Sequence, residues 1–262
     1  METLMNLQGR WSDFATQFNR DTVSKLIKNE IAYIRLPLFA SPVECEALVE
    51  GAIHEGFSPY RGVEPVINRI GNTVFEYSHI SRRDYFNLNP EIRQVQDRIF
   101  ARSFNPLERF LSHMRTHVAA DVRVARNDEG AEYYAGLIRR IEKGTLLHVD
   151  FAPGEQPDWE VGLIEDQLVW NLYLRVSNSS SGRTHIFNRE WTSEDNRLKE
   201  GIYGYNRSVV HGCDEAVFMP HVGDVIIFNT RNFHYVEPTD GERVAFTSAI
   251  GRTKDDAFIL WS

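Results

Sequence analysis

Short runs of β-branched and aromatic residues alternate with turn residues through the second half of the chain. From residue 121 onward these runs recur at the spacing typical of a β-sandwich or barrel. We predict strands at residues 121–125, 133–142, 145–150, 167–176, 183–188, 215–219, 224–228, 233–236, 243–250 and 257–261. Long helical patterns do not alternate with these runs, which disfavours a doubly wound α/β fold.

The first half of the chain has mainly helical periodicity. A short strand is expected at residues 31–36, before the first well-marked helix. That helix has a capping box, with Ser41 as the cap, Glu44 three residues later and a proline at the first helical position. Apolar residues then recur at helical spacing until Gly56, where we expect the helix to end.

Two further helices are predicted at asparagine–proline pairs, beginning at Pro90 and Pro106. Residues 57–89 contain glycine, proline, asparagine and four arginines, and they predict a long irregular loop. Loops of that length are uncommon unless they carry function. The expected fold is therefore one domain over residues 1–262, in which a helix-rich layer (1–120) supports a mainly β double sheet (121–262).

Composition narrows the class of partner and the compartment. The chain of 262 residues has a formal net charge of −8, which argues against a general nucleic-acid binder or a polybasic membrane binder. No apolar run is long enough to cross a bilayer, and residues 1–10 lack the features of a signal peptide. Cys45 and Cys213 provide no disulfide framework. We expect a cytoplasmic protein without nucleic-acid or membrane partners.

The nine histidines direct attention to metal chemistry, because histidine is the commonest metal ligand. His148 and Asp150 end a predicted strand, where residues two apart point to the same face. An imidazole and a carboxylate side by side form two thirds of the two-histidine, one-carboxylate triad that holds Fe(II) and leaves coordination positions open.

His234 is the predicted third ligand. It follows a glycine turn, a strongly apolar strand at 224–228 and a short loop. His221 precedes the same turn and is expected at the opposite end of that strand, and His211 lies in a polar segment. A pair at helical spacing, His113 and His117, has the geometry of a zinc site but no third ligand nearby in sequence.

Arg243 opens the next strand, nine residues after His234. A guanidinium is a planar, two-pronged donor suited to a carboxylate, and neighbouring antiparallel strands bring it close to the metal site. It is therefore the predicted anchor for a chelating dicarboxylate. Arg252 is the alternative anchor, although it lies beyond the predicted strand.

These residues together resemble the Fe(II)/2-oxoglutarate-dependent dioxygenases, whose fold is a double-stranded β-helix, also called a jelly roll or cupin-like fold. The similarity is greatest to the branch of small-molecule oxygenases that contains the halogenase WelO5 and related amino-acid halogenases and hydroxylases. Besides the His148-x-Asp150, His234 and Arg243 pattern, the matching segments are residues 85–86, 186–191, 223–228 and 261–262.

The resemblance implies a cofactor set and a reaction. His148, Asp150 and His234 would bind Fe(II), and 2-oxoglutarate would chelate it while its 5-carboxylate pairs with Arg243. O2 would be the oxidant, and ascorbate is expected to stimulate the reaction. Halogenases of this branch have a small residue, typically glycine, at the position of Asp150, and chloride takes the vacant site. The carboxylate here therefore implies hydroxylation of an unactivated C–H bond rather than chlorination.

The expected substrate is a small molecule, an amino acid or a derivative of one in a biosynthetic pathway. Arg82 and Arg83 are candidate binders of its carboxylate, although a solvated charge cluster is the simpler explanation of the pair. Desaturation, epoxidation and cyclisation by the same iron chemistry stay open, as does a non-catalytic cupin-like metal or ligand binder. A homodimer is also left open. Substrate choice is expected to depend on residues 57–89, 151–167 and 194–213.

Overall fold

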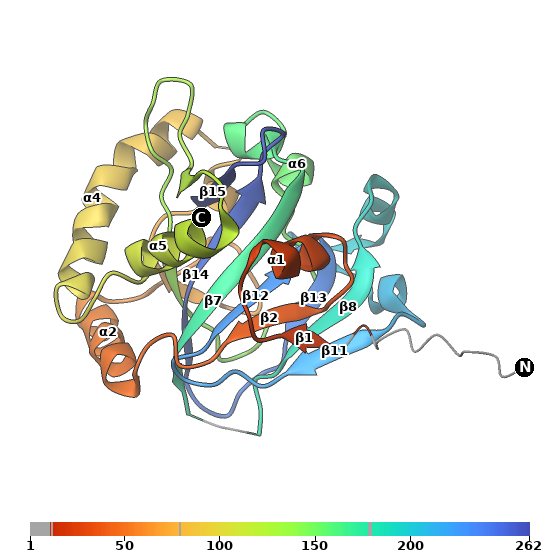
Figure 1. Ribbon diagram of the computed structural model, residues 1–262, viewed down its shortest axis with the longest axis horizontal. Coiled ribbons are helices and arrows are strands. Elements are labelled where there is room, and N and C mark those ends of the chain that lie inside the picture. Colours follow the sequence, from red (N-terminus) through yellow and green to blue (C-terminus); the bar gives the residue numbers. More distant parts are fainter. Residues whose placement is uncertain (1–10, 12, 79, 178–179) are drawn as a thin grey trace, which may run out of the picture.

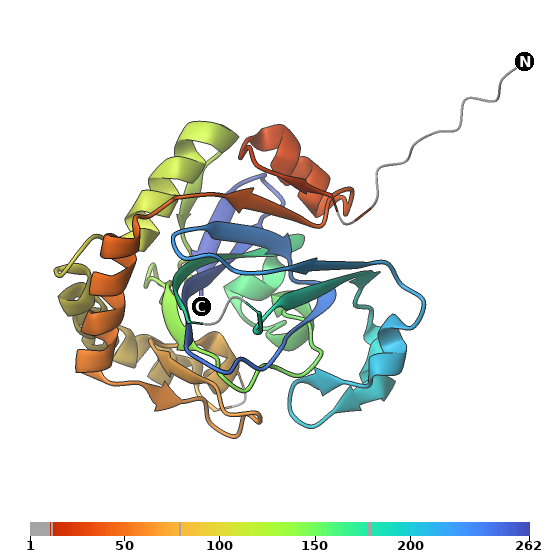
Figure 2. The ribbon, with the colours of Figure 1, turned by 90° about the horizontal axis from the view of Figure 1, so that it is seen from below.

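The computed structural model describes residues 11, 13–78, 80–177 and 180–262. A large sheet and a small sheet form the body of the molecule, and helices cover the outer face of the large sheet (Figure 1, Figure 2). The large sheet contains β1 (Phe14–Ala15), β2 (Tyr33–Leu36), β3 (Ser58–Pro59), β4 (Asn68–Ile70), β5 (Val122–Val124), β6 (Leu137–Arg140), β7 (Asp166–Val176), β12 (Val225–Asn229), β14 (Arg243–Arg252) and β15 (Phe258–Trp261).

The small sheet contains β8 (Thr184–Glu190), β11 (Glu215–Phe218) and β13 (Asn232–Val236), and β9 (Lys199–Glu200) pairs with β10 (Gly204–Tyr205). The α-helices are α1 (Arg20–Ile27), α2 (Pro42–Glu55), α3 (Val74–Tyr77), α4 (Arg82–Phe100), α5 (Pro106–Val118) and α6 (Ala152–Glu155). Short 3-10 helices are η1 (Glu160–Leu163), η2 (Ser193–Leu198) and η3 (Arg207–Val210). Among the described residues, no helix is long and apolar enough to cross a lipid bilayer.

The strand order explains how the two halves of the chain combine. The large sheet runs β1-β2-β12-β7-β14-β6-β4-β3, with β15 and β5 attached beside β14, and the small sheet runs β11-β8-β13. The two facing sheets are the arrangement predicted for a double-stranded β-helix. Strands β1 to β4 come from the part of the chain predicted to be mainly helical, and they extend the large sheet rather than stand apart from it.

Strand β7 is buried on both faces, and each face has a different task. Leu168, Trp170 and Leu172 point to the helices and belong to the main apolar core. Trp170 stacks on Phe110 of α5 with ring centroids 4.0 Å apart. The alternate residues, among them Asn171, point between the sheets and line cavities there. The helical layer therefore fixes the sheet from outside and leaves its inner face available for a site.

Nine of the ten predicted strands are confirmed in part or in full, and the tenth is wrong as a regular strand. Residues 145–150 form an extended segment that joins β13 through an isolated bridge between His148 and His234. Its other backbone hydrogen bonds to this region lie on either side of the bridge. The Thr145 N–H donates to the carbonyl of Val236, and the Asp150 N–H donates to the carbonyl of Thr230. The segment therefore pairs only at intervals, too irregularly for a continuous ladder.

The prediction of a long irregular loop over residues 57–89, with a helix beginning at Pro90, is wrong. The segment contains β3, β4 and α3, and α4 begins at Arg82 with Ser81 as its cap. Pro90 lies inside α4, where it has no N–H to donate to the carbonyl of the preceding turn. The buried face of this helix includes Asn89 and Gln96, whose polar side chains conceal the helical period. Both side chains have hydrogen-bond partners. Gln96 donates to the carbonyls of Ala135 and Gly136, and Asn89 accepts from the side chain of Asn72.

The capping box at the start of α2 is confirmed and is reinforced by an ion pair. The carboxylate of Glu44 accepts hydrogen bonds from the Ser41 backbone at 2.8 Å and from the Arg109 guanidinium at 2.7 Å. These two contacts, chiefly the one with Arg109, lower the pKa of Glu44 from 4.5 to about 2. The pair ties the start of α2 to α5.

We predict that Glu44→Gln lowers the free energy of unfolding most at neutral pH. The folded-state pKa lies below the unfolded one, so the contribution of this carboxylate is present above pH 4.5 and is lost as pH falls toward 2. Urea unfolding of both proteins, at about pH 6 and about pH 3, should show a gap in stability that narrows at the lower pH. A gap that is equal at both values would contradict this assignment.

Candidate active site

The segment that carries His148 and Asp150 lies antiparallel to β13, which carries His234. The backbone N–H of each histidine donates to the carbonyl of the other, at 2.9 Å in both directions. This exchange places the two histidines directly opposite each other, with ring centroids 4.2 Å apart. Asp150 follows two residues after His148 and turns its carboxylate toward the same place, as the sequence predicted.

One ligand atom from each of His148, Asp150 and His234 lies within 4.8 Å of the other two. His234 Nε2 is 3.7 Å from Asp150 Oδ2. Among the described residues this is the group of histidine, cysteine and acidic side chains placed to hold a metal ion. The side chain of His234 is 5% exposed and that of Asp150 is 42% exposed, so the cluster has a buried side and an open side.

The hydrogen bonds of the two imidazoles favour metal binding. Nδ1 of His148 lies 2.8 Å from the carbonyl of Leu146, and Nδ1 of His234 lies 2.9 Å from the carbonyl of Asn232. A carbonyl accepts only, so each Nδ1 carries a proton, and Nε2 is the nitrogen of each ring that is left to bind a metal. Two neutral imidazoles and one carboxylate fit Fe(II), and they occupy only one face of its coordination sphere.

Burial keeps His234 in the form that binds metal. Desolvation, and next the proximity of His148, lower the pKa of His234 to about 3. Its imidazole is therefore neutral over the physiological range, which is the protonation state of a ligand.

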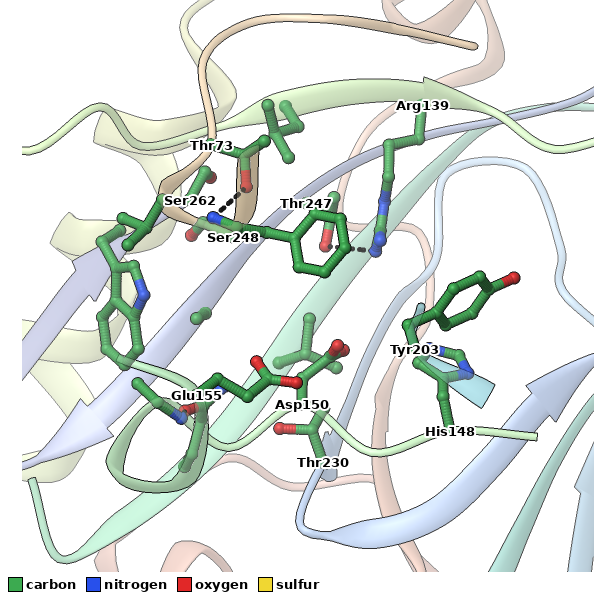
Figure 3. A pocket seen from close by; sticks show the side chains of 18 of the residues that line it. Thr73, Arg139, His148, Asp150, Glu155, Tyr203, Thr230, Thr247, Ser248 and Ser262 are labelled. Carbon is green, nitrogen blue, oxygen red and sulfur yellow. Dashed lines mark hydrogen bonds between the residues drawn. The ribbon is translucent and has the colours of Figure 1, made fainter. Parts of the chain in front are cut away.

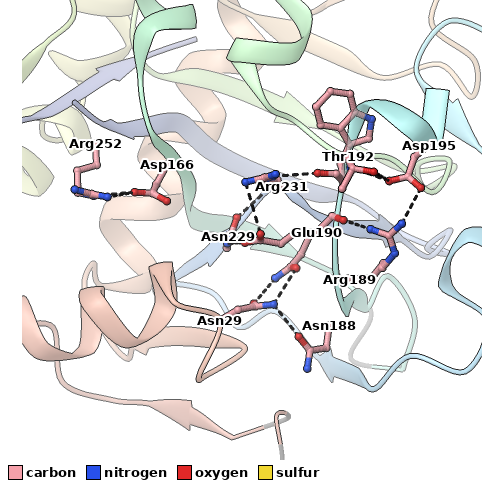
Figure 4. A network of polar contacts seen from close by, with 12 residues as sticks. Asn29, Asp166, Asn188, Arg189, Glu190, Thr192, Asp195, Asn229, Arg231 and Arg252 are labelled. Atoms are coloured by element: carbon pink, nitrogen blue, oxygen red, sulfur yellow. Dashed lines mark hydrogen bonds and ion pairs between the residues drawn. The ribbon is translucent and has the colours of Figure 1, made fainter. Parts of the chain in front are cut away.

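A polar network behind β13 positions His234 (Figure 4). The Asn232 side-chain amide donates to Asn29 at 2.6 Å, and Asn29 donates in turn to Asn188 at 2.7 Å. At the end of β12, Asn229 donates to Glu190 at 2.9 Å. These bonds join β13, β8 and the loop after α1, so the backbone that carries His234 is fixed from its far side.

Arg243, the predicted dicarboxylate anchor, is buried beside this cluster. Its Nη2 donates to Thr184 Oγ1 at 3.1 Å and to the Tyr173 hydroxyl at 3.4 Å, while its Nε is buried without a partner in the described residues. Arg243, Thr184 and Tyr173 line one cavity together with the His148, Asp150 and His234 side chains. Desolvation lowers the pKa of Arg243, which a bound anion would reverse. The site therefore has the chemistry to take a carboxylate.

The alternative residues are placed elsewhere. Arg252 pairs with Asp166, with Nε 2.8 Å from Oδ2, and with Glu165 at 3.2 Å, so its charge is already compensated. His211 and His221 do not belong to the cluster. His113 and His117 lie side by side, with ring centroids 4.2 Å apart, and the His113 ring packs on Phe18 and Phe39. Neither belongs to a group of possible metal ligands in the described residues.

A second cavity of about 150 Å³ opens on the exposed side of the cluster (Figure 3). His148 and Asp150 lie in its wall, so it adjoins the candidate metal ligands. All three segments expected to govern substrate choice contribute to its lining, and their part in selection stays a prediction. Trp261 is buried and also lines this cavity.

Arg139 and Glu155 are two charged residues of this cavity that the sequence analysis missed. Arg139 comes from β6 and borders both cavities, and Glu155 comes from α6, just after the metal motif. Burial, and then the negative charge of Asp150, raise the pKa of Glu155 above its ordinary value. The alternation of β6 is the signal that could have shown Arg139, since Leu137 and Ile141 point to the same inner side.

The predicted substrate arginines, Arg82 and Arg83, are not among the described residues that line either cavity. Arg82 forms an ion pair with Glu160 and lies over the ring of Trp159, with its guanidinium carbon 5.7 Å from the centroid. Arg83 is exposed on α4. The structure therefore does not bring them to the site, because α4 places the pair on its outer end instead of in a loop over the cavity.

The model of the family described as "Carrier-protein-independent halogenase WelO5" matches residues 59–259 of the chain. The chain belongs to this family. The match spans β3 to β15 and includes the His148, Asp150, His234 and Arg243 positions. Membership confirms the predicted branch of the Fe(II)/2-oxoglutarate-dependent oxygenases.

Two other proteins illustrate the similarity in sequence. The leucinostatins biosynthesis cluster protein S of Purpureocillium lilacinum is 34% identical over 216 residues, which cover 76% of this chain and 87% of that protein. The L-gamma-glutamyl-L-propargylglycine hydroxylase of Streptantibioticus cattleyicolor is 27% identical over 139 residues, which cover 51% of this chain and 50% of that one.

A solved structure with a similar fold is the N-substituted L-amino acid dioxygenase of Burkholderia ambifaria, which has also been solved in complex with α-ketoglutarate. The TM-score is 0.63 at 12% identity, over 93% of this chain and 91% of that one. At this identity the likeness concerns the fold alone, and it confirms the predicted jelly roll.

Proposed function

We propose that this protein is an Fe(II)- and 2-oxoglutarate-dependent hydroxylase of an amino acid or an amino-acid derivative in a biosynthetic pathway. The observation that carries the proposal is the Asp150 carboxylate beside His148 and His234. Halogenases of this branch have a small residue there, which leaves room for chloride on the iron. Since this member of the family retains the carboxylate, we assign hydroxylation rather than halogenation.

In this proposal, His148, His234 and Asp150 hold the iron through two Nε2 atoms and one carboxylate oxygen. The Nδ1–H bonds to the carbonyls of Leu146 and Asn232 orient the rings. When bound, Fe(II) with 2-oxoglutarate and O2 supplies the oxidant for a C–H bond, as 2-oxoglutarate is converted to succinate and CO2. The protein contributes ligation, orientation and a cavity that excludes bulk water.

Arg243 holds the far carboxylate of 2-oxoglutarate in the same proposal. Its guanidinium is 5% exposed and lies at the end of a cavity that begins at the triad. Thr184 and Tyr173 add hydroxyl groups next to it, both within hydrogen-bond distance of its Nη2. A dicarboxylate that chelates the metal at one end therefore meets a buried cation and two hydroxyl groups at the other.

The relatives support the class of substrate. One is named as a hydroxylase of L-gamma-glutamyl-L-propargylglycine, and the other as part of a leucinostatin biosynthesis cluster. We place the reaction in the cytoplasm, where the free thiols of Cys45 and Cys213 stay reduced, and assign it to one oxygenase domain.

The test is formation of succinate from 2-oxoglutarate with Fe(II), ascorbate and O2, in the presence of a panel of amino acids and N-substituted amino acids. We expect at least one panel member to increase succinate formation and to gain one oxygen atom. Metal binding without succinate formation from any panel member would favour the non-catalytic binder instead.

We predict that Asp150→Gly weakens iron binding about 10- to 100-fold or more, because one of three protein ligands is lost. The vacancy also recreates the halogenase-like position, so added chloride should partly restore iron affinity. Calorimetric titration with Fe(II) under argon, with and without chloride, measures both effects. Full iron affinity together with full hydroxylation in Asp150→Gly would show that Asp150 is not a ligand; Asp158→Gly, which alters an exposed carboxylate, is the control.

A further inference from the structure

Two groups of opposite charge face the cavity beside the triad, and neither has a counter-ion in the described residues. Arg139 extends from β6 on one side, and the Glu155 carboxylate extends from α6 on the other side, next to Asp150 (Figure 3). Charged side chains at a partly buried site are normally paired, because desolvation without a partner is costly. A guanidinium and a carboxyl group that face one cavity from two sides, with no ion pair to either in the described residues, therefore suit a ligand with both charges.

The guanidinium of Arg139 has capacity for an anion. Its one hydrogen bond in the described residues goes from Nη2 to Thr247 Oγ1 at 3.3 Å, and no carboxylate there lies within ion-pair distance of it. The neighbouring Arg140 differs, since it points away, lies over the Phe57 ring and is 3.5 Å from Glu142. Of two adjacent arginines, only Arg139 lines the cavity.

The carboxylate of Glu155 has capacity for a cation. Within the described residues it has no ion pair, and the weaker influences on its charge are Lys199 and a side-chain hydrogen bond with Gln156. The like charge of Asp150 acts on it more strongly, and a bound metal ion would neutralise that charge. An ammonium group of a ligand would compensate the charge of Glu155.

The remaining walls limit the size and polarity of the ligand. Most of the side chains between the two charges are apolar, and they include Val63, Ile67, Val74, Phe75 and Leu137. The volume of about 150 Å³ equals that of an engineered protein cavity that takes up benzene. The space suits one aliphatic side chain, not a folded peptide.

We propose that this cavity selects an amino acid with an apolar side chain and with both ionic groups free, whose ammonium group pairs with Glu155 and whose carboxylate pairs with Arg139. This inference rests on the proposed function and deepens it. The apolar side chain then lies against the apolar walls beside the open side of the triad. Arg243 serves 2-oxoglutarate in the deeper cavity, so the two arginines bind different carboxylates.

The experiment measures binding of probe ligands to the protein loaded with Mn(II) and 2-oxoglutarate, by isothermal titration calorimetry. The probes are L-valine, L-leucine and L-methionine, each compared with its N-acetyl derivative, which lacks the cation, and its amide, which lacks the carboxylate. We expect the best free amino acid to bind about tenfold or more tightly than either of its derivatives, since each derivative leaves one buried charge unpaired.

The variants assign each pole of the ligand. Glu155→Gln should weaken binding of the free amino acid about tenfold or more and leave binding of the N-acetyl derivative unchanged. Arg139→Met should likewise weaken binding of the free amino acid about tenfold or more and leave binding of the amide unchanged. Arg139→Lys keeps the charge and should retain part of the preference, which separates lost recognition from misfolding. Arg140→Met and Glu194→Gln, which alter side chains outside the cavity, should behave as the unaltered protein.

Three results overturn the inference. The first is equal binding of the free amino acids and their derivatives, and the second is binding of Mn(II) and 2-oxoglutarate but of no free amino acid. The third is an Arg139→Met variant that loses affinity for 2-oxoglutarate as strongly as Arg243→Leu does, which would assign Arg139 to the cosubstrate. If the unaltered protein binds neither Mn(II) nor 2-oxoglutarate, the proposed function itself fails, and this inference fails with it.

Discussion

Replacing His148 with alanine should abolish substrate-dependent succinate formation, with a loss on the order of a thousandfold. Changes to outer partners of metal ligands cost about 10- to 100-fold, and His148 supplies a ligand directly. The substitution also leaves the Nε2 of His234 and the Asp150 carboxylate as the two remaining donors, which is too few to hold Fe(II) firmly. Succinate formation and calorimetric titration with Fe(II) should fall together.

The control for this variant is His211→Ala, which alters an exposed histidine at the end of η3 that does not belong to the cluster. It should retain iron affinity and turnover. A His148→Ala variant that is folded, by circular dichroism, and still turns over 2-oxoglutarate at the normal rate would refute the ligand assignment.

Replacing Arg243 with leucine should raise the KM for 2-oxoglutarate on the order of a hundredfold, because a desolvated charge pair of this kind is worth a few kcal/mol. The effect should be confined to the cosubstrate. Arg243 lines the cavity of the triad without belonging to the triad, so the affinity for Fe(II) alone should change little. Steady-state kinetics over a range of 2-oxoglutarate concentrations, with a separate metal titration, measures both.

Arg252→Leu is the matched control, since Arg252 lies on the same strand but is paired with Asp166 and Glu165. Its KM for 2-oxoglutarate should stay unchanged, although stability is expected to decrease. An unchanged KM in Arg243→Leu, with a raised KM in Arg252→Leu, would transfer the anchor to the alternative that the sequence left open.

The sequence was sufficient for the triad because its chemistry is local. His148 and Asp150 are two residues apart, and an extended backbone places such residues on one face whether or not the segment forms a regular strand. His234 lies in β13 of the small sheet and Arg243 opens β14 of the large sheet. The order of these residues along the chain predicted both of them, but Arg243 meets the triad across the space between the two sheets, not along a pair of neighbouring strands. Residues 145–150 form an extended segment and not the regular strand that was predicted, and this difference leaves the placement of His148 and Asp150 unchanged.

The sequence was insufficient where function depends on packing between segments that are far apart along the chain. Arg139 adjoins an equally charged neighbour, and the alternation along β6 separates the two only once the inward-facing side of the strand is known from its pairing with β14. Glu155 lies in a segment with no periodic pattern, and its place depends on the short helix α6. The start of α4 was missed because Asn89 and Gln96 are buried polar residues with partners from distant segments, which a hydrophobic pattern cannot show.

The central claim is that a family of halogenases includes here a member that hydroxylates, because Asp150 occupies the place of the halide. The most direct measurement is mass spectrometry of the products formed under ¹⁸O2 in chloride buffer with 2-oxoglutarate, Fe(II) and the amino acid that best stimulates turnover. The account predicts one ¹⁸O atom in succinate and one in the amino-acid product, in equal amounts. A product that carries chlorine in place of oxygen would contradict it.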